Sequence, residues 1–179
     1  MWTVDKDYLL QFDAYKFFAD DEDCYEYCRV KHDVADHIKP KRILEIGIGW
    51  GYSAYSFLSA APDAYYLGID INDNHRPAYL NFLSPFNVET VITDSQRLTD
   101  LHTKPFDLIH VDGDHSYNCC LRDLGVTLRI LNKTGGLLVD DADSNQSVAH
   151  AIKDFMDMNP QLTGEFIKSR RGDYLIRYK

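Results

Sequence analysis

The predicted fold depends most on one glycine-rich segment, Leu44-Glu45-Ile46-Gly47-Ile48-Gly49-Trp50-Gly51-Tyr52-Ser53-Ala54. Glycines let the backbone turn sharply and approach a ligand closely, and a helix that follows offers free N–H groups to a carboxylate or a phosphate. We therefore predict a nucleotide-type cofactor loop between a strand and a helix, although tight strand-to-helix packing alone would also explain the glycines. The candidate cofactor-binding residues here are Glu45, Gly47, Gly49, Gly51 and Ser53.

Short apolar runs on either side of this segment extend the pattern. Each run ends in a polar or glycine-rich turn, and longer amphipathic stretches fill the gaps, which is typical of buried parallel strands in an α/β fold. Residues 165–169 and 173–178 alternate around a short turn and predict an antiparallel hairpin. The sequence thus predicts a doubly wound, mostly parallel, seven-stranded Rossmann-like sheet with a C-terminal antiparallel hairpin. The five predicted parallel strands are 42–46, 65–69, 89–92, 106–111 and 136–139.

Helices are predicted in three parts of the chain. Residues 6–38 form one or two helices that end before Pro40. Residues 117–131 carry apolar side chains at helical spacing and predict a helix with one apolar stripe. A further helix runs from Ser144, a candidate N-cap, to about Met158.

Length and charge narrow the class of protein. The 179 residues suit a single domain, in which 1–40 would be a helical N-terminal extension and 41–179 the cofactor-binding sheet with its helices. A net charge of −9 argues against a duplex nucleic-acid binder that depends on phosphate contacts. No apolar run approaches the ~20 residues that cross a bilayer, and the N-terminal segment is acidic where a signal peptide would be basic. We therefore expect a cytoplasmic protein with no membrane partner.

Polar side chains follow the second and third predicted strands. Asp70 lies about 20 residues after the glycine loop, where an adenosine cofactor would offer its ribose hydroxyls to a carboxylate. Asp94, Ser95 and Gln96 follow the third strand, and their short side chains could bond the edge of an adenine ring. A capped turn would explain the same three residues equally well.

Carboxylates gather after the fourth and fifth predicted strands. Asp112, Asp140 and Asp141 would crowd at one edge if these strands are neighbours about 4.8 Å apart. Like charges so close favour a hard divalent cation with oxygen ligands, and Mg²⁺ is the predicted ion. The alternative is that one carboxylate caps the helix near Ser144 while another is solvated.

His115 is the histidine placed among these acids. An imidazole with a pKa near ~6.5, oriented by neighbouring carboxylates, suits a general base. His110 lies inside a predicted strand and is expected to be a core residue. The predicted catalytic residues are therefore His115 and Asp112.

Together these motifs resemble the class I S-adenosylmethionine-dependent methyltransferases, and more narrowly the metal-dependent O-methyltransferases. The segment from Glu45 to Ala54 is similar to the cofactor loop of catechol O-methyltransferase. The run Ile109-His110-Val111-Asp112-Gly113-Asp114-His115-Ser116-Tyr117 is closer to the bacterial branch of macrolide sugar O-methyltransferases and cephalosporin-hydroxylase-like proteins.

The resemblance implies roles for residues and a reaction. Asp70 would bind the ribose, Ser95 and Gln96 would contact the adenine, and Asp112 would also border the cofactor. Asp112, Asp140 and Asp141 would hold Mg²⁺ or another divalent cation, and His115 would deprotonate the acceptor. The implied function is Mg-dependent methyl transfer from S-adenosylmethionine to a hydroxyl of a diol-like small molecule, a sugar or a glycan.

Other readings stay open at this point. Asp70 after a glycine-rich turn also suits a nicotinamide-dependent oxidoreductase, although the Gly-x-Gly-x-Gly spacing is not that of a dinucleotide-binding turn. A catalytically silent cofactor-binding or interaction protein could keep the same fold. Aromatic residues between Tyr8 and Phe18 recur at near-helical spacing, and they could form the face of a homodimer, a substrate lid or, equally well, a surface that packs onto the sheet.

Overall fold

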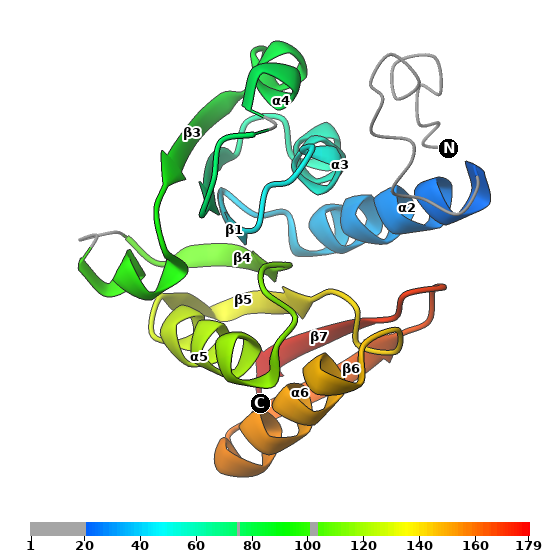
Figure 1. Cartoon of the computed structure of the whole chain (residues 1–179), viewed down its shortest axis with the longest axis vertical. Helices are drawn as coiled ribbons and strands as arrows, with labels where there is room; N and C mark the ends of the chain where they lie inside the picture. Colours follow the sequence, from blue (N-terminus) through cyan, green and yellow to red (C-terminus); the bar gives the residue numbers. More distant parts are fainter. Residues whose placement is uncertain (1–20, 75, 101–103) are drawn as a thin grey trace.

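The computed structural model describes residues 21–74, 76–100 and 104–179, in which seven strands form one sheet (Figure 1). The strands are β1 (Arg42–Ile46), β2 (Tyr65–Asp70), β3 (Asn87–Ile92), β4 (Phe106–Val111), β5 (Leu131–Val139), β6 (Leu162–Ile167) and β7 (Asp173–Tyr178). Their order across the sheet is β3-β2-β1-β4-β5-β7-β6. Strands β1 to β5 are parallel, and β7 is antiparallel to both β5 and β6. The predicted fold class is confirmed.

The predicted parallel strands are all present, with shifts at their ends. The largest shift is in β5, which begins at Leu131 because this residue pairs with Phe106 at the start of β4. Leu131 had been predicted as the end of the helix 117–131, and that boundary is wrong. An apolar residue at this position satisfies the helical and the strand pattern alike, and pairing with β4 decides between them.

The C-terminal hairpin is confirmed with a longer turn than predicted. Strand β7 has the predicted bounds, but β6 spans 162–167 rather than 165–169. The register pairs Leu162 with Tyr178 and Ile167 with Asp173. Residues 168–172 therefore form the connection, in which Gly172 has a φ of 72°.

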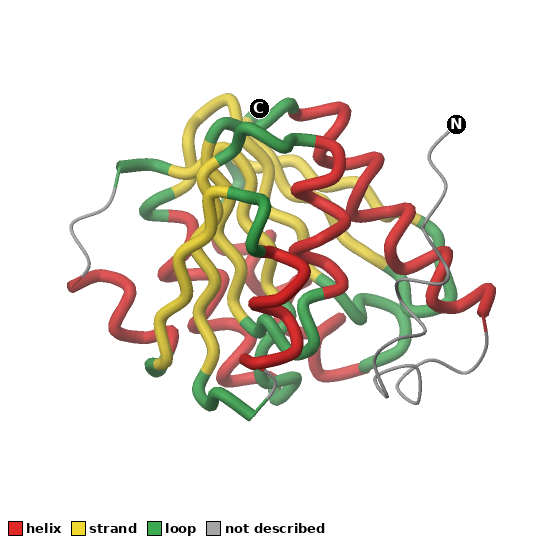
Figure 2. Tube along the Cα trace, turned by 90° about the horizontal axis from the view of Figure 1, so that it is seen from above, coloured by secondary structure: helices red, strands yellow, loops and turns green. Residues whose placement is uncertain are grey.

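Helices cover both faces of the sheet, as Figure 2 shows from above. One face packs against α2 (Asp21–Ile38), α3 (Tyr52–Ala60) and α4 (Arg76–Leu83), through a core that includes Val34, Phe57 and Tyr79. The other face packs against α5 (Tyr117–Leu128) and α6 (Gln146–Met158), through a core that includes Leu124 and Phe155. The carboxyl ends of the parallel strands are left for the connecting turns, where the predicted site residues lie.

The start of helix α6 differs from the prediction, and the start of helix α2 lies at the edge of the described residues. Asn145, not Ser144, caps α6, because its side-chain oxygen accepts hydrogen bonds from the N–H groups of Ser147 and Val148. Helix α2 confirms the later part of the predicted segment 6–38, whose first part lies outside the described residues. Among the helices in the described ranges, each is too short or too polar to span a bilayer.

Candidate active site

The glycine-rich turn after β1 brings two segments of the chain close together. Gly47 has a φ of 85°, in the left-handed region that glycine adopts without strain. A Cβ atom placed on Gly47 would overlap the backbone oxygen of Asp112, which follows β4. The missing side chain at Gly47 therefore allows the turns after β1 and β4 to meet at the carboxyl edge of the sheet.

Asp70, at the end of β2, holds this turn in place. Its Oδ2 accepts hydrogen bonds from the backbone N–H groups of Ile48, at 3.0 Å, and Gly49, at 3.1 Å. Its Oδ1 accepts a further bond from the N–H of Asn72 at 3.1 Å. A carboxylate that accepts several backbone N–H groups is a strong local constraint, so Asp70 fixes the backbone of the glycine loop.

A cavity of about 360 Å³ lies beside Gly47 and Asp70, at the carboxyl ends of the parallel strands. Its volume falls in the range of about 300–1,000 Å³ that is typical of small-molecule sites. The predicted cofactor-binding residues that line it are Gly47, Asp70, Ser95, Gln96 and Asp112. The structure thus brings together residues from the turns after β1, β2, β3 and β4.

Sequence reasoning missed Asp123, which lines the same cavity from α5. Its Oδ1 accepts a 2.6 Å hydrogen bond from the hydroxyl of Ser95, which joins α5 to the turn after β3. Burial raises the pKa of Asp123, although the Ser95 hydrogen bond opposes the shift. The one available signal was an acidic residue three positions after Cys120, on the apolar stripe of a predicted helix.

Glu45 does not line the cavity. Its side chain is fully buried in β1, accepts a hydrogen bond from the Tyr66 hydroxyl, and has Oε1 2.7 Å from Nδ1 of His110. The structure therefore gives Glu45 a place in a core network instead of the predicted cofactor contact. His110 is buried as expected, and contact with Glu45 outweighs burial and raises its pKa.

The remaining predicted cofactor residues also lie outside the cavity lining. Gly51 is the N-cap residue of α3, and Ser53 is buried within the first turn of that helix. Gly49 contributes its backbone N–H to Asp70. Asp94 accepts a 3.0 Å hydrogen bond from the N–H of Gln96, which is the capped turn that the sequence left open.

An acidic cluster lies at the same edge of the sheet and consists of Asp112, His115 and Asp141. Nε2 of His115 is 3.3 Å from Oδ1 of Asp112 and 3.2 Å from Oδ2 of Asp141. The hydroxyl of Ser144 donates a hydrogen bond to the other oxygen of Asp141. The imidazole is therefore held between two carboxylates, as expected for an oriented base.

Burial and charge change the protonation equilibria of this cluster. Burial, together with the negative charge of Asp140, raises the pKa of Asp112 to about 6. The hydrogen bond from His115 to Asp112 and the nearby carboxylates raise the pKa of His115 above its usual value. Shifted groups of this kind beside a cavity mark a candidate functional site.

Asp140 is not brought into this cluster, contrary to the prediction. Its Oδ1 lies 2.7 Å from Nζ of Lys31, and the same ammonium lies 2.7 Å from Oδ1 of Asp173. All three side chains are buried. Although burial opposes ionisation, the Lys31 charge lowers the pKa of Asp140 to about 2. The sequence could not reveal this contact because Lys31 lies 109 positions before Asp140.

Comparison with known proteins identifies the family. Residues 44–142 match the model of a family described as a methyltransferase domain. The match includes the glycine turn, every cavity residue and the acidic cluster. This chain belongs to that methyltransferase family. The predicted resemblance to class I methyltransferases is thereby confirmed.

Solved structures share the fold of this methyltransferase. The O-methyltransferase TomG from Streptomyces achromogenes, in complex with SAM, is 19% identical with a TM-score of 0.77, covering 99% of this chain and 91% of that one. An O-methyltransferase from Bacillus cereus in complex with SAH is 16% identical with a TM-score of 0.76, covering 97% and 90%. SAH-bound PaMTH1 from Podospora anserina is 18% identical with a TM-score of 0.69, covering 100% and 98%. No curated protein matches the chain.

One residue connects the two parts of the site in this methyltransferase. Asp112 lines the cavity and also belongs to the acidic cluster, so both parts meet at the end of β4. A group bound in the cavity and a second molecule bound at His115 would therefore be close neighbours. That arrangement is what transfer of a small group between two bound molecules requires.

Proposed function

We propose that the protein is an S-adenosylmethionine-dependent O-methyltransferase that acts on a hydroxyl of a diol-like small molecule, a sugar or a glycan. The observation that carries the proposal is the shared position of Asp112, at the junction of a nucleoside-sized cavity and a carboxylate-oriented imidazole. The matched O-methyltransferases, one in complex with SAM and one with SAH, support the choice of cofactor and reaction.

The cavity residues suit the adenosine part of the cofactor. Asp70 offers carboxylate oxygens at the place where ribose hydroxyls are bound in nucleotide-binding α/β folds. Ser95, Gln96 and Asp123 offer polar atoms at the neighbouring turn and on α5, where the exocyclic amine of adenine would find acceptors. Gly47 lines the cavity as well, and a glycine backbone can approach a ligand closely.

His115 is the proposed base. In its neutral form the imidazole would carry its proton on Nε2, which faces Asp112 and Asp141 and is held by them, and would accept the acceptor's hydroxyl proton at Nδ1. As the oxygen forms its bond to the methyl carbon, the bond from that carbon to sulfur breaks, and S-adenosylhomocysteine is the leaving molecule. The proton remains on His115, so atoms and charges balance.

A divalent cation is part of the proposal. Two of the three carboxylates predicted to bind it, Asp112 and Asp141, lie close enough together to do so. Asp112 and Asp141 present carboxylate oxygens within 4.8 Å of each other and of the His115 nitrogen, and carboxylates suit Mg²⁺ and Mn²⁺. When bound, the ion would lower the pKa of an acceptor hydroxyl. A homodimer and a cytoplasmic location stay predictions of the sequence.

Calorimetric titration of S-adenosylhomocysteine, with Mg²⁺ and again with a chelator, tests the cofactor assignment. We expect binding in both conditions and at least about tenfold weaker binding to Asp70→Asn, because charge-assisted hydrogen bonds would be lost. Asp63→Asn, at an exposed position, is the matched control. Failure to bind S-adenosylhomocysteine together with tight NADH binding would replace the proposal by the oxidoreductase alternative.

A second assay tests the reaction. The protein is incubated with S-adenosylmethionine, Mg²⁺ and a panel of vicinal diols and sugars, and mass spectrometry follows S-adenosylhomocysteine and the methylated acceptor. The proposal predicts both products in equal amounts, with no product from acceptors that lack a hydroxyl. Methylation of amine acceptors alone would contradict the assignment to hydroxyl groups.

A further inference from the structure

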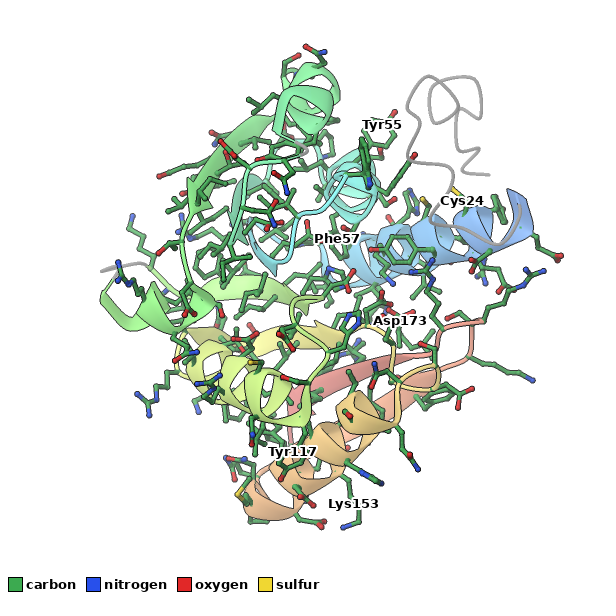
Figure 3. The ribbon with its side chains drawn as sticks, viewed as in Figure 1. Cys24, Tyr55, Phe57, Tyr117, Lys153 and Asp173 are labelled. Atoms are coloured by element: carbon green, nitrogen blue, oxygen red, sulfur yellow. The ribbon has the colours of Figure 1, made fainter. Side chains whose placement is uncertain are left out.

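Behind the acidic cluster lies a second set of ligand-type side chains, formed by His110, Asp140 and Asp173. These residues lie in β4, directly after β5 and at the start of β7. One ligand atom from each lies within 4.8 Å of the others, and all three residues are buried. Figure 3 shows Asp173 between β7 and α2, where side chains from several elements converge.

The Lys31 ammonium enters this set from α2. Its Nζ contacts Oδ1 of Asp140 and Oδ1 of Asp173, each at 2.7 Å, and the lysine is fully buried. Burial disfavours the ammonium, but the two carboxylates outweigh this effect and raise the pKa of Lys31. The lysine is therefore a permanent cation between two carboxylates.

Two buried polar atoms of the set are left over. Within the described residues, neither Oδ2 of Asp140 nor Nε2 of His110 has a hydrogen-bond partner. An unsatisfied buried acceptor and ring nitrogen are unfavourable in a folded protein unless something else binds them. These atoms are ligand types that divalent transition-metal ions accept.

We infer that Lys31 occupies the place of a divalent cation in the set His110, Asp140 and Asp173, and thereby withholds Asp140 from the site formed by Asp112 and Asp141. The site that the proposed function assigns to the catalytic cation then has two protein carboxylates rather than three. Lys31 is a positioning residue, because it touches Asp140 and Asp173 and contacts neither His115 nor Asp112 in the hydrogen-bond pattern. The inference rests on the proposed function only for the role of the Asp112 and Asp141 site.

Binding of Mn²⁺ alone, followed by the electron paramagnetic resonance signal of the free ion, tests the inference without any turnover. As a single substitution, Asp140→Asn should leave the Mn²⁺ dissociation constant within about twofold of the wild-type value. Asp112→Asn should raise this constant at least about tenfold. A tenfold weakening in Asp140→Asn would show that Asp140 is already a ligand and would overturn the inference.

Removing the ammonium provides the complementary test. Lys31→Met in an Asp112→Asn background should gain a Mn²⁺ site, and Asp140→Asn should abolish that gained site. Lys31→Arg, which keeps the charge, should gain none. Lys153→Met removes an exposed lysine from α6, far from Asp173 in Figure 3, and should also gain none. Absence of a gained site in folded Lys31→Met would overturn the inference.

Folding and cofactor binding are checked separately. Circular dichroism verifies the fold of each variant, and if Lys31→Met fails to fold, Lys31→Gln replaces it, because glutamine removes the charge, keeps a polar side chain and leaves Asp140 and Asp173 in place. If the wild-type protein binds no Mn²⁺, the inference stands or falls on whether Lys31→Met gains a Mn²⁺ site. S-adenosylhomocysteine titration of the same samples shows whether the proposed function fails, independently of the Mn²⁺ result.

Discussion

Tyr27 donates a 3.0 Å hydrogen bond to Oδ2 of Asp112, so that helix α2 contacts the acid shared by the cavity and the acidic cluster. The Tyr27 ring also lies 3.8 Å from the Lys31 ammonium and 5.3 Å from the Arg171 guanidinium. Helix α2 was predicted as an extension outside the sheet. Its side chains nevertheless help to build the site.

Tyr27→Phe should separate the hydrogen bond to Asp112 from the ring contacts with Lys31 and Arg171, because it removes the hydroxyl and keeps the ring. Loss of one buried hydrogen bond to a charged group should lower the free energy of unfolding by about 1.5–3 kcal/mol in urea titrations. Methyl transfer should fall several-fold, while S-adenosylhomocysteine binding stays close to wild type. Tyr25→Phe, on the same helix but 43% exposed, is the control. Equal loss of stability in both variants would contradict a specific role for the Asp112 contact.

Gly47→Ala should be among the most destabilising small substitutions in the chain. The new Cβ would overlap the backbone oxygen of Asp112, and the φ of 85° would be strained for alanine. We expect a loss of at least about 2 kcal/mol in the free energy of unfolding. The matched control is Gly125→Ala in α5, where a Cβ meets nothing within 4 Å. That variant should gain about 0.5–1 kcal/mol because alanine is the better helix former.

Asp123→Asn should change stability in a pH-dependent manner. Burial raises the folded-state pKa of Asp123 above the unfolded value of about 3.9. The folded wild type therefore binds the proton more tightly, and its stability falls as pH rises from the unfolded pKa through the folded one. The asparagine variant escapes this loss and can still accept the Ser95 hydrogen bond, so its melting temperature should exceed that of wild type at neutral pH.

The difference between these melting temperatures should shrink as the pH falls through the raised folded-state pKa of Asp123, because the wild-type carboxyl then takes up its proton in the folded state. Asp63→Asn, at an exposed position, should show no such trend. Because Asp123 lines the cavity, the stabilised variant should also bind S-adenosylhomocysteine differently from wild type. A melting-temperature difference that is constant with pH would exclude the raised pKa as its cause.

Local pattern was sufficient for most of the fold. Strand runs such as 42–46 and 106–111 are short, apolar and bounded by turns, so their positions follow from the chain itself. The boundary at Leu131 failed because the deciding partner, Phe106, is distant in sequence. A sequence pattern depends only on residues that are close along the chain, whereas pairing across the sheet selects between two locally acceptable structures.

In the candidate site, too, the positions of residues could be predicted from the sequence but their partners could not. Asp70 and Asp112 could be placed at one edge because the ends of parallel strands meet there. The partners of each carboxylate could not be deduced, since Lys31, Tyr27 and Asp123 come from helices whose packing the sequence does not state. Charge crowding predicted Mg²⁺ beside Asp140, whereas the cation that contacts Asp140 in the structure is the Lys31 ammonium.

His115→Ala should abolish the proton transfer while leaving the cavity intact. Loss of a general base lowers turnover by about 10²–10⁴-fold, and S-adenosylhomocysteine should bind as to wild type because His115 does not line the cavity. Added imidazole should restore part of the turnover in His115→Ala, since a free base can enter the space left by the side chain. His150→Ala, at an exposed position on α6, should have wild-type turnover. A His115→Ala variant with weakened cofactor binding and no response to imidazole would indicate that the side chain shapes the site rather than accepting the proton.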